Sequence, residues 1–227
     1  MVVGTLDPNP QVAGRGVKMM REAGIDVLVG VMEQECRELN KRFFCLQEKH
    51  RPYVILKWAE TADGYIDRRR EAGAPLVIST PLMKHLVHQQ RAENMAIMVG
   101  TRTALLDNPR LLTTRWSGRN PVRITLDRHG VLPQDSRIFS PEAPTIVYRE
   151  NTDWQFILQD LAERNIHSVL VEGGTCLLQH ILDLGIYDEV HIEVGNQRIG
   201  DGVRAPHYVR STQPMIVDGH RVYIEER

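Results

Sequence analysis

The stretch from Arg91 to Arg115 constrains the fold more than any other part of this 227-residue chain. It predicts the end of a helix, a buried strand at Met95–Val99, a tight turn at Gly100-Thr101 and a brief helix that closes at Asp107-Asn108-Pro109. A strand that opens through a Gly-Thr turn into a helix can present backbone N–H groups to a phosphate. With an acid and several arginines close by, this stretch is the first candidate for a functional site.

The same alternation of strand and helix continues over residues 51–227 and predicts an α/β fold. Thr80 is suited to cap a helix whose first residue is Pro81, and Asp218-Gly219 is typical of a hairpin turn. The sheet should be mixed and mostly parallel, flanked by helices, with an antiparallel C-terminal edge. Strands are predicted at 52–59, 76–79, 95–99, 121–127, 145–148, 168–171, 189–194, 214–217 and 222–225, and helices at 81–93, 153–164 and 175–184. In the first of these helices, the stripe of Leu82, Met83, Leu86, Val87 and Gln90 predicts a core face.

Residues 1–50 form a separate small α/β piece in this interpretation. A helix is expected at 17–23, a strand at 25–29 and a charged helix at 33–44. Gly14-Arg15-Gly16 before the first helix resembles part of a dinucleotide-binding fingerprint, but the third glycine and the preceding strand are missing. A helix-start loop is therefore the better interpretation.

Composition excludes several classes of protein. The formal net charge of −1 gives no basic surface for nucleic acid, and no apolar run reaches the roughly 18 residues that a membrane span needs. The N-terminus lacks the pattern of a signal peptide, and three cysteines without disulfide-like spacing favour reduced thiols. These features predict a cytoplasmic protein.

Metal and nucleophile motifs are also missing from the sequence. There is no CxxC, HExxH, Gly-x-Ser-x-Gly or Walker loop, so no metal is expected. His85 and His88 lie three residues apart on a predicted helix, but without a third ligand nearby they are interpreted as solvent-facing. What remains is a second turn, Glu172-Gly173-Gly174-Thr175, between a strand and a helix. Its glycines fit either an anion-binding helix start or an ordinary tight turn.

Three motifs over residues 51–227 resemble the reductase domain of riboflavin biosynthesis. Lys57–Gly64 (KWAETADG) is similar to the family's K-x-A-x-S-x-D-G. The stretch from Arg91 through Asp107-Asn108-Pro109 to Arg115 is similar to its central motif, and Val171–Gly174 to its V-E-G-G. Because the motifs occur in the family's order, the match is specific. The family's fold resembles dihydrofolate reductase, in agreement with the mixed sheet.

The resemblance implies reduction of 5-amino-6-(5-phosphoribosylamino)uracil to its 5-phosphoribitylamino form, with hydride from NADPH delivered to the ribose C1′. Matched position by position, it implies substrate contacts at Arg91, Leu112, Arg115 and Glu172. It implies cofactor contacts at Ala59, Thr103, Asp107 and the segment Gly174–His180, with the pyrophosphate over Gly173-Gly174-Thr175. Asp107 is the expected acid–base group, supported electrostatically by Lys57, although Asp-Asn-Pro is also a common turn sequence.

The chain departs from the family pattern at three places. Pro75 and Val77 stand where the family usually has a substrate-contacting Ser and a cofactor-stacking Trp. Arg110-Leu111 lengthens the loop before Arg115 by one residue. Arg128 replaces a usual Ser near the adenosine phosphate, and a guanidinium there favours NADPH over NADH.

Residues 1–50 resemble the end of the zinc deaminase domain that precedes this reductase in the bifunctional enzyme, without its zinc motif. The resemblance therefore implies a reductase at 51–227, a deaminase remnant at 1–50, no deaminase activity from this chain and a homodimer. Two alternatives remain: a reductase of the same fold acting on another pterin or pyrimidine, and a catalytically silent nucleotide-binding domain. Retention of four polar groups at the site disfavours the silent domain.

Overall fold

The computed structural model describes residues 1–227 and divides into two compact units. The first unit comprises Met1–Tyr53 together with Leu158–His167. The second comprises Val54–Ile157 together with Ser168–Arg227. Among the helices, none combines the length and the apolar composition that a membrane crossing needs.

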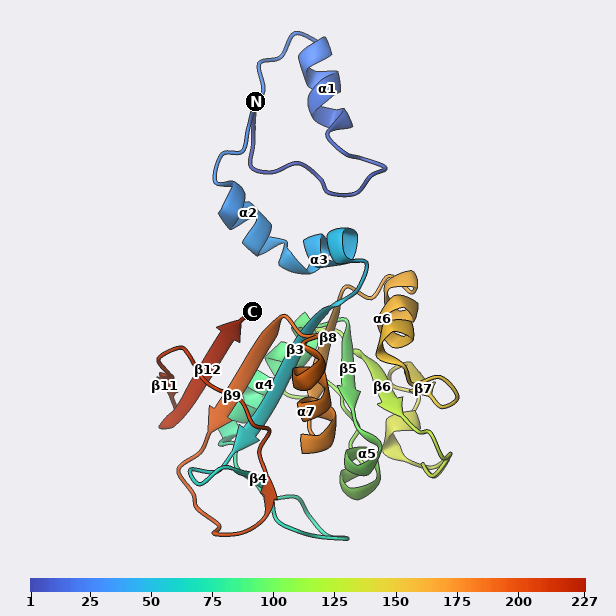
Figure 1. The fold of residues 1–227 in the computed structure, drawn as a ribbon, viewed down its shortest axis with the longest axis vertical. Helices are drawn as coiled ribbons and strands as arrows, with labels where there is room; N and C mark the ends of the chain where they lie inside the picture. The colour runs from blue at the N-terminus through green and yellow to red at the C-terminus, as the bar shows by residue number, and fades with distance from the viewer. The chain divides into compact units, whose positions relative to one another are not determined.

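An eight-stranded sheet dominates the second unit (Figure 1). Its strand order is β11-β12-β9-β3-β8-β5-β6-β7, with β3 Tyr53–Glu60, β5 Ala96–Val99, β6 Val122–Leu126, β7 Thr145–Tyr148, β8 Ser168–Glu172, β9 Glu189–Val194, β11 Met215–Val217 and β12 His220–Glu226. Strand β12 runs antiparallel to both β9 and β11, whereas β9 pairs with β3, and β5 with β6 and β8, in parallel. The expected mixed, mostly parallel sheet with an antiparallel C-terminal edge is confirmed.

Helices cover both faces of this sheet. In Figure 1, α7 (Thr175–Leu184) lies in front of the sheet and α4 (Pro81–Glu93) behind it. The short helix α5 (Thr101–Asp107) follows β5, and α6 (Trp154–Glu163) precedes β8. With both faces covered, β5 is almost wholly buried, at 0–1% exposure for each of its four residues. This explains why its sequence is a continuous apolar run rather than an alternating one.

Two small features were not predicted correctly. Strand β4 (Tyr65–Asp67) pairs antiparallel with β10 (Val203–Arg204), and neither strand was expected. The strand expected at 76–79 is wrong, because this segment has no partner strand. Its backbone groups bind side chains instead: the Leu76 N–H donates to Asp67 at 2.8 Å, and Gln197 donates to the Val77 carbonyl at 2.9 Å.

Residues 1–50 of the first unit contain three helices and a parallel pair of very short strands. The helices are α1 (Arg15–Glu22), α2 (Glu33–Leu39) and α3 (Lys41–Lys49), and the strands are β1 (Val2–Val3) and β2 (Leu28–Val29). The prediction of a single helix at 33–44 is wrong, because α2 and α3 are separated by a turn at Asn40. The Asn40 amide donates to the Cys36 carbonyl at 2.9 Å, and such side-chain bonds to the preceding turn compete with a continuing helix.

The start of α4 follows the expected capping chemistry. Thr80 has extended backbone angles, its Oγ1 accepts the Met83 N–H at 3.2 Å, and Pro81 occupies the first helical position. The expected core stripe is only partly correct. Met83 is 5% exposed, whereas Leu82 is 50% exposed, so the prediction for Leu82 is wrong.

Loss of the Thr80 cap should destabilise the fold. Thr80→Ala removes the acceptor for the Met83 N–H and should lower the free energy of unfolding by about 1 kcal/mol in urea titration. Thr80→Ser keeps the hydroxyl and should stay close to the wild type. Equal losses in both variants would contradict a capping role.

Candidate active site

The predicted site residues converge on the carboxyl-terminal edge of the parallel strands. Glu172 ends β8, Thr103 lies on the helix that follows β5, and the Arg91 side chain reaches Glu172 from the last turn of α4. In open α/β sheets this edge is where ligands bind, because the loops there meet between neighbouring strands. The site therefore forms from segments that are far apart in the sequence.

A two-point ion pair between Arg91 and Glu172 forms the centre of the site. Arg91 Nε donates to Glu172 Oε1 at 3.0 Å, and Nη2 donates to Oε2 at 2.6 Å. The remaining Nη1 donates to the Leu112 carbonyl at 3.3 Å. Three of the four predicted substrate contacts are thus joined directly, one each from α4, β8 and the loop after α5.

The protonation states of this pair follow from burial and charge. Burial by itself raises the pKa of Glu172, but the charge and hydrogen bonds of Arg91 outweigh it and the net pKa lies below the ordinary value, with Lys57 and His88 also lowering it. Burial lowers the pKa of Arg91, but Glu172 reverses this and the net pKa is raised. Both groups are therefore charged across the neutral range.

His88 is a site residue that sequence reasoning missed. Its Nδ1 accepts the Thr114 N–H at 3.1 Å, and its side chain is half-buried. Burial and the charges of Arg91 and Arg115 lower the pKa of His88, although Glu172 opposes them. The interpretation of His88 as solvent-facing is wrong, while His85 is exposed as expected. The signal was present, because His88 lies three residues before Arg91 on the same helix face.

Lys57 lies on the sheet face that α4 covers. It pairs in register with His191 of the neighbouring strand β9, so the two side chains share a face. His191 Nδ1 lies 2.7 Å from the Gln90 amide nitrogen on α4. The charge of Lys57 acts on Glu172 and helps to lower its pKa. The structure thus groups Lys57 with the Arg91–Glu172 pair.

The Gly173-Gly174 turn packs against Thr103 on α5. Both glycines have positive φ, 79° and 80°, a conformation that other residues rarely adopt. A Cβ at Gly174 would lie 3.1 Å from Thr103 Oγ1, and one at Gly173 would lie 3.4 Å from Thr103 Cγ2. Backbone conformation and the close approach of Thr103 therefore both favour glycine at these positions, and no side-chain hydrogen bond caps the start of α7.

The remaining predicted cofactor residues surround this turn less closely. The Thr175 hydroxyl donates to the Arg204 carbonyl, so the β10 segment lies beside the start of α7. Ala59 is half-buried in β3, in register with Glu193. Arg128 is exposed in the turn after β6.

Asp107 lies one turn after Thr103 on α5 and forms an ion pair with Arg70. Arg70 also binds Asp67 through Nε at 2.7 Å and the Gly73 carbonyl at 2.9 Å. Burial lowers the pKa of Arg70, but its two carboxylate partners outweigh burial and the net pKa is raised. Arg70 is thus a permanent cation beside Asp107 that sequence reasoning missed, although it sits in an arginine run just after the Asp63-Gly64 turn.

The lengthened loop before Arg115 is accommodated by two unusual residues. Asn108 and Leu111 have positive φ values of 39° and 54°. Leu111 is 4% exposed and belongs to the core cluster around Ile97 and Val99. Its burial holds the next residue, Leu112, beside Arg91 despite the extra residue.

Two departures from the family pattern, Pro75 and Val77, lie in a segment that is anchored at its end. Ser79 Oγ donates to Glu193 at 2.6 Å, and His220 Nδ1 lies 2.8 Å from the other Glu193 oxygen. Val77 itself is exposed. The segment is therefore fixed by Ser79, while the Val77 side chain faces outward.

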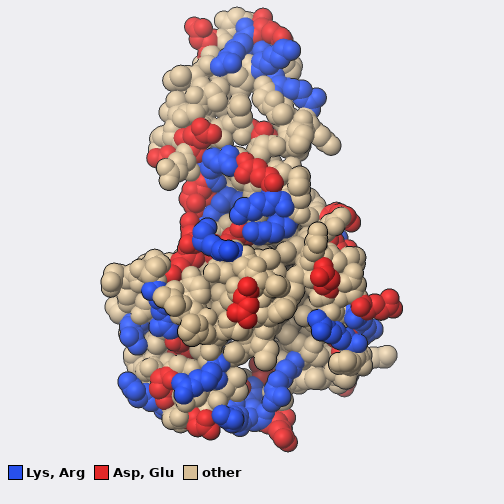
Figure 2. All heavy atoms as spheres, viewed as in Figure 1, with Lys and Arg blue, Asp and Glu red and all other residues tan.

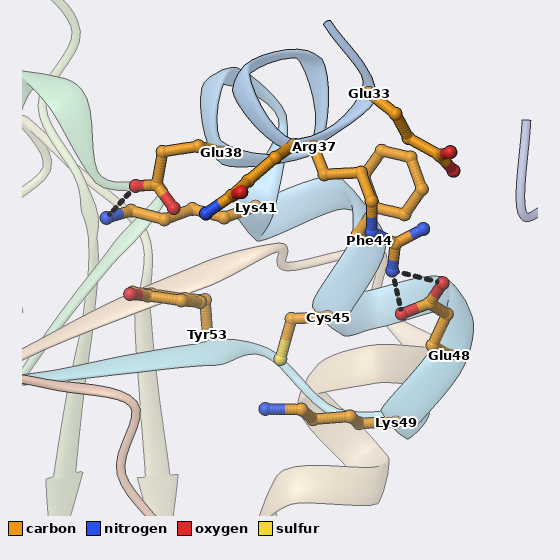
Figure 3. A pocket seen from close by; sticks show the side chains of 10 residues that line it. Glu33, Arg37, Glu38, Lys41, Phe44, Cys45, Glu48, Lys49 and Tyr53 are labelled. Atoms are coloured by element: carbon orange, nitrogen blue, oxygen red, sulfur yellow. Dashed lines mark hydrogen bonds and ion pairs between the residues drawn. The ribbon is translucent and has the colours of Figure 1, made fainter. Parts of the chain in front are cut away.

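Charged side chains elsewhere form paired arrangements. Figure 2 shows Lys and Arg mixed with Asp and Glu around the edge where β4 lies, and Arg69 pairs there with Asp201 at 3.2 Å. In the first unit, α2, α3 and Tyr53 line a pocket of about 540 Å³ (Figure 3). Its Arg37 binds Glu48 and its Lys41 binds Glu38, each at 2.7 Å. Both cations thus have acidic partners next to the pocket.

Glu172→Gln should destabilise the protein and change its acid sensitivity. The substitution leaves Arg91 as a buried charge without its counter-ion, which should cost about 3–5 kcal/mol in urea titration. The lowered pKa of Glu172 means that its contribution is present above its ordinary value of 4.5 and is lost as the pH falls below that value.

Stability measured from neutral to acid pH should therefore fall less steeply in Glu172→Gln than in the wild type. Glu150→Gln, at an exposed position, serves as the matched control and should leave both quantities unchanged. Parallel curves for wild type and Glu172→Gln would contradict the assignment.

The chain is similar to proteins of riboflavin biosynthesis. Residues 52–219 match the family model described as the RibD C-terminal domain. The riboflavin biosynthesis protein RibD of Aquifex aeolicus is 36% identical over 226 residues, which cover 89% of this chain and 63% of that protein. The chain thus spans about three fifths of such relatives.

Solved structures agree with this match. A diaminohydroxyphosphoribosylaminopyrimidine deaminase/5-amino-6-(5-phosphoribosylamino)uracil reductase from Thermotoga maritima superposes with a TM-score of 0.85 and 35% identity, over 99% of this chain and 70% of that one. Dihydrofolate reductase from Enterococcus faecalis, at a TM-score of 0.53 and 13% identity over 77% of this chain and 96% of that one, shares the fold. The expected fold is confirmed, and so is the resemblance: the chain belongs to the RibD C-terminal domain family, the reductase domain of riboflavin biosynthesis.

Proposed function

We propose that this chain reduces 5-amino-6-(5-phosphoribosylamino)uracil to the 5-phosphoribitylamino product with NADPH. The observation that carries the proposal is the cluster of Arg91, Glu172, Leu112 and Lys57 beside the Gly173-Gly174 turn. Cationic groups for an anionic substrate thus lie next to a turn suited to a dinucleotide, in a chain of this reductase family.

The substrate's polar groups match the chemistry of the cluster. Arg91 and Arg115 offer planar, permanently charged donors for phosphate or carbonyl oxygens. Glu172 offers acceptor oxygens for N–H or hydroxyl groups of the substrate, and its charge is maintained by Arg91. Leu112 contributes an apolar side chain to the cluster. It is buried next to Leu111, which anchors the loop in the core.

The cofactor residues fit a nicotinamide dinucleotide. No side chain caps the start of α7 after Gly174, and the backbone N–H groups of a helix start favour a pyrophosphate. We assign the other contacts to Ala59, Thr103, Asp107, Thr175 and Arg128. NADPH, when bound, supplies the hydride that reduces the ribose C1′.

The protein's own part in the reaction is proton transfer and positioning. The ribose ring must open before C1′ can accept hydride, and ring opening needs a proton to move. We assign this role to Asp107, whose carboxylate is oriented by Arg70. Lys57 supports the developing charge from the face shared with Glu172.

Residues 1–50 are, in this proposal, the end of a deaminase domain that lacks its zinc motif in this chain, and residues 51–227 form the reductase domain. The superposition on the Thermotoga maritima protein extends over 99% of the chain and so includes this segment. We further propose a homodimer, which gel filtration with light scattering tests directly: a mass of one chain would exclude it.

Purified protein should oxidise NADPH in the presence of the deaminated ribosylaminouracil phosphate. Asp107→Asn removes the acid–base group and should lower kcat by about 100-fold or more, measured by loss of nicotinamide absorbance. Asp183→Asn, on the exposed end of α7, is the matched control and should keep full turnover.

Three outcomes separate the alternatives. Full turnover by Asp107→Asn would remove its acid–base role while leaving the function intact. Oxidation with dihydrofolate but not with the uracil would favour another reductase of the same fold. Tight NADPH binding without oxidation of either would favour a silent domain.

Cofactor choice should depend on Arg128. If its guanidinium binds the 2′-phosphate, Arg128→Ser should raise the KM for NADPH by about tenfold or more and leave the KM for NADH unchanged. Arg119→Ser, at another exposed position, should change neither. Equal catalytic efficiency of the wild type with both cofactors would contradict the assignment.

A further inference from the structure

We propose that one face of α4, formed by His85, His88 and Arg91, positions the loop of residues 111–118. In this proposal the loop is held by the hydrogen bond from the Thr114 N–H to neutral His88, which we call the clasp. The loop carries Leu112 and Arg115, so this inference rests on the proposed function for its effect on substrate binding. His88 acts through the loop and is a positioning residue. The hydrogen bond between Thr114 and His88 can be tested without measuring enzyme activity.

Three contacts, spaced by three residues on α4, follow the loop in order. Arg91 Nη1 donates to the Leu112 carbonyl at 3.3 Å, and the Thr114 N–H donates to His88 Nδ1 at 3.1 Å. The His85 and Trp116 rings meet edge to face, with centroids 5.5 Å apart. Residues three apart share a helix face, so one side of α4 contacts Leu112, Thr114 and Trp116 in turn along the loop.

The end of the loop also lies close to α4. A Cβ at Gly118 would come within 2.7 Å of the Ala92 Cβ, so the loop backbone lies directly on the helix there. Thr113 binds residues that directly follow the loop: its N–H donates to Asn120 Oδ1 at 2.9 Å, and its hydroxyl donates to the Arg119 carbonyl at 3.2 Å. Leu111 anchors the start of the loop in the core, and α4 contacts the loop from Leu112 to Gly118.

The clasp requires a neutral imidazole. A nitrogen that accepts the Thr114 N–H carries no proton, so the ring's proton is on Nε2. The charged groups that face His88 are Arg91 on its own helix, Arg115 in the loop and Glu172 at the end of β8, together with the backbone of Leu112. Burial and the two arginines lower the pKa of His88 below its ordinary 6.5, and Glu172 and Leu112 only partly oppose them.

Acidification should therefore release the loop. A proton on Nδ1 would face the Thr114 N–H, and the new positive charge would repel Arg91 and Arg115. The contact is present above the pKa of His88 and is lost as the pH falls through it. Because Arg115 moves with the loop, substrate affinity should weaken in acid while cofactor affinity does not.

Steady-state kinetics of His88 variants test this inference from about pH 5 to pH 8. His88→Ala removes the acceptor and should raise the substrate KM about fivefold, with kcat and the KM for NADPH unchanged. His88→Asn places a non-titrating oxygen near the Nδ1 position and should restore the wild-type KM at neutral pH. It should also lack the additional rise in acid that the wild type shows.

Two controls isolate the effect. The substrate phosphate itself titrates near pH 6, but this contribution is common to all variants and cancels in the comparison. His50→Asn makes the same substitution at an exposed left-handed position, which Asn tolerates, and should match the wild type. Equal KM values for His88→Ala and His88→Asn, or the same acid rise in His88→Asn as in the wild type, would overturn the clasp.

A measurement without substrate separates this inference from the proposed function. In ¹⁵N-labelled protein, the Thr114 amide shift should follow the titration of the His88 imidazole and should stop doing so in His88→Asn. Independence of the two signals in the wild type would overturn the clasp. If the uracil substrate is not turned over but the signals titrate together, the proposed function fails and the clasp stands.

Discussion

The buried ion pair of Arg91 and Glu172 is the interaction on which the site depends. Its partners are separated by 81 residues and lie on different elements, the last turn of α4 and the end of β8. Two charges removed from water are tolerable only when each satisfies the other with good geometry, which the two parallel bonds provide. The pair thereby fixes where α4 sits against the sheet, and the third donor of Arg91 fixes the loop at Leu112.

The glycine pair imposes the second constraint. Gly173 and Gly174 follow Glu172 directly, so the ion pair and the proposed pyrophosphate turn are rigidly linked. Their contact with Thr103 ties α5 to the start of α7. The groups proposed to bind substrate and cofactor thus lie side by side, which suits the proposed hydride transfer between two bound molecules.

Much of the fold was predictable because local patterns and tertiary structure agree. Apolar runs gave β5, β7 and β9 within a residue, and Thr80-Pro81 and Gly185 marked helix ends correctly. The failures lie where side chains compete with backbone pairing. Asn40 divides a predicted helix, and residues 76–79 are extended but bind Asp67 and Gln197 instead of a strand. Pattern alone cannot distinguish such a segment from a strand.

The sequence by itself determined most of the strands and helices of the main sheet, the glycine-containing turns between them, and the motifs that place Arg91, Asp107, Arg115 and Glu172 in one family. These properties are local, because a turn or a helix cap is specified by adjacent residues. Only the tertiary structure decided the partners: Arg70 for Asp107, 37 residues away, and the Thr114 backbone for His88, 26 residues away. Such pairings depend on how the sheet brings distant segments together, and no spacing along the chain encodes them.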